Sequence, residues 1–196
     1  RGYESVSIAD ILEKSGVNSG SLYYFFRAKE DLLLAVLDWY LENLYPQVID
    51  PALQATSDPI ERVFAVLEGY RQMLTITECQ MGCPIGNLAL EMSEKSEAVR
   101  SKIAQNFQNW RAAIRDMLVA AGTRIPAGTD YETLATFILT VMEGGVMQAR
   151  AHRSIAPFEQ SIALLRDYMN RLVANPDLSS DAPLGSRHEG WWDELM

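Results

Sequence analysis

Apolar residues recur every three or four positions along most of this chain, and this periodicity constrains the fold more than any other feature. One such stripe is formed by Leu33, Leu37, Leu41 and Leu44. Alternation of apolar and polar residues, as in a half-buried strand, is not sustained anywhere, and the β-branched residues fall at helical spacing. The sequence therefore predicts an all-α protein.

Capping residues, glycine and proline predict where the helices begin and end. Ser7 and Asp10 have capping-box spacing, and Gly16 stands where a left-handed residue ends a helix. Pro46 and Pro51 are expected to close the third helix. We predict helices over about 8–15, 19–26, 30–45, 59–74, 88–93, 97–121, 131–151 and 157–173, with loops at 79–87 and 122–129.

Composition excludes several classes of protein. No stretch approaches the roughly 20 apolar residues that a membrane helix needs, and no signal-peptide pattern opens the chain. Cys79 and Cys83, with only His152 and His188 far downstream, are a poor set for a disulfide framework or a zinc site. We expect a cytoplasmic protein with no membrane partner, no metal and no cofactor.

Catalytic motifs are missing from the sequence. It contains no GxSxG, HExxH, Walker loop or GxGxxG. Glu91, Glu94 and Glu97 fall on a stretch where a solvated face is their simplest role. An enzyme is therefore the alternative that the sequence favours least.

The segment from Ser7 to Lys29 has the layout of a helix-turn-helix, in which the second helix enters the major groove of DNA. Small residues Ser19, Gly20 and Ser21 open that second helix, so its backbone can approach DNA closely. The spacing alone fits an ordinary helical hairpin equally well. Net charge of the whole chain is −9 and residues 1–30 are neutral, so any DNA contact must be local.

The run SIADILEKSGVNSGSLYYFFRAKEDLL, Ser7 to Leu33, resembles the head signature of the TetR family. Gly16, Val17, Gly20, Leu22, Tyr23, Phe26, Lys29, Glu30 and Leu32 match it. The resemblance implies a DNA-reading head and a C-terminal helical domain that binds a small-molecule effector and forms a homodimer on palindromic double-stranded DNA.

The resemblance also implies roles for single residues. Ser19, Gly20 and Tyr24 would face base edges, Ser7, Ser21, Tyr23 and Lys29 would hold the DNA backbone, and Leu22 and Phe26 would form the core of the head. Two departures stand out. Phe25 replaces a frequent histidine, and Arg1-Gly2-Tyr3 looks like the end of a first head helix that this chain otherwise lacks.

The last two predicted helices carry a heptad seam. Its apolar positions are either intramolecular core or, as the resemblance implies, a dimer interface. We predict dimerisation through Ile138, Val141, Gly145, Phe158, Ile162, Leu165 and Met169.

Aromatic and methionine side chains are frequent in the larger domain and suit an apolar ligand pocket, although each could be ordinary core. The ligand-binding set that we predict is Tyr70, Met73, Met81, Cys83, Met92, Phe107, Trp110, Phe137 and Met142. Glu91, Glu143 or Arg150 could add polarity.

Cys83 supports a separate hypothesis. It precedes a predicted helix, whose positive end would favour a thiolate, and a subgroup of the family with a Gly-Cys pair at this place includes members that respond to electrophiles. The alternative is a buried, inert cysteine.

These patterns divide the chain into a DNA-binding head over residues 1–30, a regulatory domain over 31–175 and a polar tail over 176–196 with Trp191-Trp192. The predicted function is a transcriptional repressor that its effector releases from DNA. A DNA-binding protein of the same fold without an effector is the alternative.

Overall fold

A computed structural model describes residues 2–174, and the tail lies outside them. Helices connected by short turns make up this part of the chain, which contains no strand. The helices are α1 (Ile8–Ser15), α2 (Ser19–Phe25), α3 (Lys29–Leu44), the π-helix η1 (Tyr45–Ile49), α4 (Asp50–Ala55), α5 (Pro59–Ile76), α6 (Pro84–Met92), α7 (Glu97–Ala120), the 3-10 helix η2 (Gly122–Arg124), α8 (Tyr131–His152) and α9 (Ala156–Ala174).

The predicted all-α class and the predicted caps are confirmed. Ser7 and Asp10 form the capping box of α1, and Gly16 ends that helix with a left-handed φ of 68°. The Asn18 side chain accepts the N–H of Ser21 at the start of α2. Each of these caps satisfies a backbone group that a helix end leaves unpaired.

The third α-helix ends at Leu44, within one residue of the predicted end, but the chain then continues through the π-helix η1 into α4, which was not predicted. A proline lacks the N–H that the regular helical bond requires, and here the backbone widens by one residue instead of stopping. Helix α6 also begins at Pro84, four residues earlier than expected, because proline is tolerated in a first helical turn.

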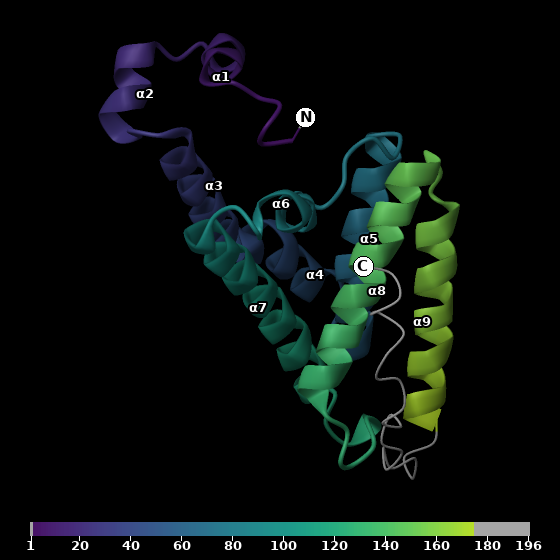
Figure 1. The fold of residues 1–196 in the computed structure, drawn as a ribbon. Coiled ribbons are helices and arrows are strands. Elements are labelled where there is room, and N and C mark those ends of the chain that lie inside the picture. The colour runs from purple at the N-terminus through teal and green to yellow at the C-terminus, as the bar shows by residue number, and fades with distance from the viewer. Residues whose placement is uncertain (1, 175–196) are drawn as a thin grey trace, which may run out of the picture.

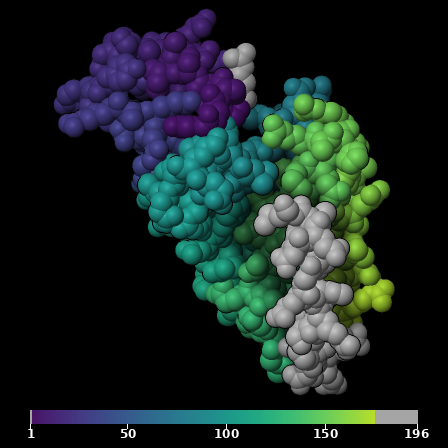
Figure 2. All heavy atoms as spheres, viewed as in Figure 1, coloured from purple at the N-terminus to yellow at the C-terminus, as the bar shows by residue number. Residues whose placement is uncertain are grey.

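The head stands apart from the larger domain (Figures 1 and 2). Helices α1 and α2 lie at one end, and α3 leads from them into the body, where it packs against α7. Helix α8 packs between α7 and α9 and also contacts α5. The core of the body includes Leu37, Leu74, Val99, Leu118 and Ile138. Among the described helices, none has the length and apolarity required to cross a membrane.

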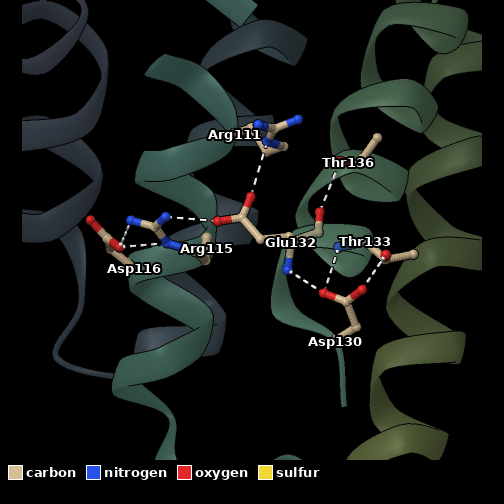
Figure 3. Close-up of polar contacts among 7 residues, drawn as sticks. All are labelled: Arg111, Arg115, Asp116, Asp130, Glu132, Thr133 and Thr136. Carbon is tan, nitrogen blue, oxygen red and sulfur yellow. Dashed lines mark hydrogen bonds and ion pairs between the residues drawn. The ribbon is translucent and has the colours of Figure 1, made fainter. Parts of the chain in front are cut away.

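A polar network joins α7 to α8 at the end of the body far from the head (Figure 3). Glu132 pairs with Arg111 at 3.1 Å and with Arg115 at 2.7 Å. Asp130 caps α8 by accepting the N–H groups of Glu132 and Thr133. These ion pairs are substantially exposed, so each contributes little to the stability of the fold.

Candidate functional site

Helix α2 presents its beginning to solvent at the outer end of the head (Figure 1). Ser19, Gly20 and Ser21 are all exposed. The left-handed turn at Gly16 places α1 behind them, as in a helix-turn-helix. This exposed first turn of α2 has unhindered backbone and hydroxyl groups that can approach another molecule closely.

Aromatic side chains continue the same exposed surface. Tyr24 is 82% exposed, Tyr23 is half-exposed, and the rings of Tyr24 and Phe25 meet edge to face at 4.9 Å. Leu22 is the buried residue of α2, and Phe26 is half-buried. Large exposed aromatics are costly to hydrate unless they have a partner. This surface, the reading face, consists of Ser19, Gly20, Ser21, Tyr23 and Tyr24.

Two predicted backbone-holding residues already have partners within the chain. The Ser7 hydroxyl accepts the N–H of Asp10 and donates to its carboxylate. The Lys29 ammonium donates to the Tyr3 carbonyl and lies 4.1 Å from the centre of its ring. Ser7 is exposed and Lys29 is half-buried, and the role of both residues in holding the DNA backbone stays a prediction. Arg27, which sequence reasoning did not name, is the exposed cation nearest to α2 in sequence.

A cavity of about 620 Å³ lies inside the body, between α3, η1, α4, α5 and the start of α6. Its aromatic and sulfur-bearing lining consists of Trp39, Tyr40, Tyr70, Met73, Met81, Cys83 and Trp110. The rings of Tyr70 and Trp110 lie 5.6 Å apart. A cavity of this size and apolar character suits an organic molecule of drug-like dimensions.

A second cavity of about 730 Å³ lies on the other side of Cys83, between α6, α7 and α8. Its lining includes Phe107, Arg111, Glu143 and Arg150. Arg111 is held by Glu132 at 3.1 Å, and Arg150 donates to the Asn87 side chain at 2.8 Å. Cys83 and Gly82 line both cavities and therefore separate them.

Buried titratable groups meet at this partition. Burial raises the pKa of Glu143, and burial together with the Glu143 carboxylate raises the pKa of the Cys83 thiol to about 12. Burial and the neighbouring Cys83 also raise the pKa values of Tyr70 and Tyr40. Each shift disfavours the negatively charged form of the side chain. Binding a further anion at this partition would therefore be unfavourable.

The pKa of Cys83 argues against the predicted thiolate. Cys83 is the N-cap of α6 as expected, and its sulfur accepts the Gly86 N–H at 3.5 Å, which lowers the pKa. Burial and Glu143 outweigh this effect. The alternative of a buried, unreactive cysteine fits the structure better.

Only part of the predicted ligand-binding set lines one of the two cavities. Tyr70, Met73, Met81, Cys83 and Trp110 line the first cavity, and Phe107 lines the second. Three residues are corrections: Met92 and Met142 are buried in the core, and Phe137 lies on the outer face of α8.

Trp39 and Tyr40 line the first cavity but are absent from the predicted ligand-binding set. Both lie on α3 near the π-helix, and an aromatic pair just before a proline-interrupted helix is the signal that could have found them.

The predicted dimer seam is used within one chain. Phe158 and Met169 of α9 are buried, and the Phe158 ring packs against Gly145 of α8, where an added β-carbon would come within 3.1 Å. Ile138 and Leu165 are also buried, and Val141 and Ile162 are half-buried. These contacts fit the alternative of intramolecular core, because heptad periodicity identifies an apolar face but not the helix that covers it. Val141, Gly145 and Leu165 also line the groove on the outer side of α8 and α9, and dimerisation through the seam stays a prediction.

The outer face of α8 and α9 carries different apolar residues. Leu164 is 71% exposed, and the exposed rings of Phe137 and Tyr168 meet at 5.7 Å. Val141 and Gly144 lie in the shallow groove beside them. We call Phe137, Leu164 and Tyr168 the outer α8/α9 face.

Comparison with known proteins follows the same division into head and body. Residues 1–36 match the family "Bacterial regulatory proteins, tetR family". Residues 59–163, just over half of the chain, match the family "Transcriptional regulator LmrA/YxaF-like, C-terminal domain".

Individual relatives span nearly all of the chain. The HTH-type transcriptional regulator YxaF of Bacillus subtilis is 28% identical over 80% of this chain and 81% of its own length. The HTH-type transcriptional repressor DhaR of Mycobacterium sp. strain GP1 is 25% identical over 84% and 82%. The structure of a cysteine mutant of CifR with 26-bp operator DNA is 29% identical, with a TM-score of 0.70 over 87% and 88% of the two chains.

Proposed function

The chain belongs to the TetR family of bacterial regulatory proteins, in its LmrA/YxaF-like group, and we propose that it works as a homodimeric repressor that a small molecule releases from a palindromic operator. DNA binding and transcriptional regulation follow from the family. The dimer and the release by an effector are the parts that we add.

The reading face carries the proposal. An exposed first helical turn with small residues, followed by Tyr23 and Tyr24, fits a major groove, where tyrosine hydroxyls can reach phosphates or base edges. A single short helix binds weakly, and two heads about 34 Å apart would read successive grooves of a palindrome. The outer α8/α9 face is the surface through which we place the second copy.

The position of the first cavity supports the proposed release by an effector. It lies behind α3, the helix that leads into the head, so a molecule seated against Trp39 and Tyr40 would contact that helix directly. A shift of a few degrees in α3 would change the spacing of two heads and weaken their simultaneous fit to DNA.

The experiment is selection of duplexes from a random-sequence pool, followed by native mass spectrometry of the recovered complex. We expect an inverted repeat and two protein chains per duplex. Recovery of no preferred sequence, or of one chain on a non-repeated site, would contradict the proposal.

A further inference from the structure

Helix α6 connects the cavities to the head. Its first turn lies at the partition, where Cys83 caps it and Gly86 contacts Glu143. Near its other end, Glu91 extends towards the segment that precedes α1, which runs back from the head to α6 (Figure 1).

The Glu91 carboxylate binds the backbone of that segment with both oxygens. One oxygen accepts the N–H of Tyr3 at 2.8 Å, and the other accepts the N–H of Glu4 at 2.7 Å. These two bonds, led by the one from Glu4, lower the pKa of Glu91. Gly2 permits the approach, because a β-carbon there would lie 2.6 Å from the carboxylate.

Further polar contacts join the head to the body, but they are few. Lys95 pairs with Glu4 at 3.1 Å, and the Ser96 hydroxyl donates to Glu30 at 2.8 Å. Apolar packing within the head is slight, since α1 has no fully buried residue and α2 has only Leu22. A small number of directional bonds, together with the packing of Tyr3 against the body core, therefore holds the head in place.

We propose that Glu91 is a positioning residue that sets the orientation of the DNA-reading head relative to the ligand-binding body. Because α6 is a single helix of nine residues, a displacement at its cavity end would be transmitted to Glu91 and would change the distances from its carboxylate to both N–H groups. The regulatory part of this inference rests on the proposed function, whereas the positioning part does not.

The test compares Glu91→Gln with Glu94→Gln in the full chain. Glu94 is exposed and lies three residues from Glu91, but its own carboxylate makes no ion pair with the described head segment, so it serves as the matched control. A glutamine at position 91 keeps one acceptor oxygen and turns its NH₂ group towards an N–H, so one of the two bonds is lost. Hydrogen exchange at the Tyr3 and Glu4 amides is the first readout.

We expect Glu91→Gln to speed exchange at these amides by about 5- to 10-fold, without a change in the melting temperature of the body, and Glu94→Gln to leave the exchange unchanged. Gly2→Ala, whose added β-carbon displaces the Glu91 carboxylate, should speed exchange at these amides to a similar extent. The exchange rate of the double variant should not exceed that of either single variant. Unchanged exchange in Glu91→Gln, or fully additive effects, would overturn the positioning role.

The second readout is binding to the duplex recovered by selection with the wild-type protein. Loss of affinity in Glu91→Gln, with wild-type affinity in Glu94→Gln, is the expected result, and equal affinities would overturn the link to regulation. If the wild type selects no duplex, the proposed function fails, and the exchange experiment still decides whether Glu91 orients the head.

Discussion

The carboxylate of Glu143, on α8, occupies the space that a β-carbon on Gly86 would need. Gly86 lies in the first turn of α6, so this contact joins the two helices at the partition between the cavities. An alanine here would require the end of the Glu143 side chain to shift, whereas the backbone angle is that of a regular helix and does not demand glycine.

Gly86→Ala should therefore push α6 and α8 apart or force Glu143 into another rotamer. We expect the free energy of unfolding to fall by about 1–3 kcal/mol, as for overpacking at other tight sites. Urea denaturation measures this change. Gly69→Ala is the control, because no atom lies within 4 Å of its added β-carbon and it sits inside α5. That control should gain up to about 1 kcal/mol from helix propensity, and a comparable gain in Gly86→Ala would contradict the contact.

Cys83 should react slowly with iodoacetamide in the native protein. The thiolate is the reacting form, and a pKa of about 12 in place of 9.0 reduces its fraction at pH 8 about a thousandfold. Peptide mapping distinguishes Cys83 from Cys79. Because the negative charge of Glu143 raises the Cys83 pKa, Glu143→Gln should lower it and speed the reaction, whereas Glu132→Gln should not. A native rate close to that of the unfolded chain would contradict this assignment.

Leu164→Glu should weaken the proposed dimer. Leu164 is the most exposed residue of the outer α8/α9 face, and a buried unpaired carboxylate between two copies is strongly unfavourable. We expect the dimer dissociation constant in sedimentation equilibrium to rise more than about tenfold. Ile76→Glu, at an even more exposed apolar position at the end of α5, is the control. Equal effects of both variants, or none, would place the interface elsewhere.

Local features were predictable from sequence because their causes lie within a few residues. The Ser7 and Asp10 capping box, the turn at Gly16 and the Asn18 cap each depend on contacts between near neighbours. The exposure of the reading face follows from the same local pattern. The all-α class needed only the helical period of the apolar residues.

The cavity and the outer α8/α9 face depend on contacts between distant segments. Periodicity shows that Phe158 is apolar and inward-facing, but only the fold reveals that Gly145 of the same chain receives it. Met142 likewise belongs to the ligand-like class of side chains, yet it is fully buried in the core. Glu91 carried no local signal at all, because its partners lie 87 and 88 residues away.

The most direct test of the account is the affinity of Tyr24→Ala for the selected duplex, measured by fluorescence anisotropy beside Tyr45→Ala. Tyr24 lies on the reading face, whereas Tyr45 is a partly exposed tyrosine of η1 in the body. Loss of a groove contact typically removes about 1–3 kcal/mol, so the dissociation constant of Tyr24→Ala should rise about tenfold or more. Tyr45→Ala should bind as the wild type does. Wild-type affinity in Tyr24→Ala would contradict the claim that α2 reads DNA.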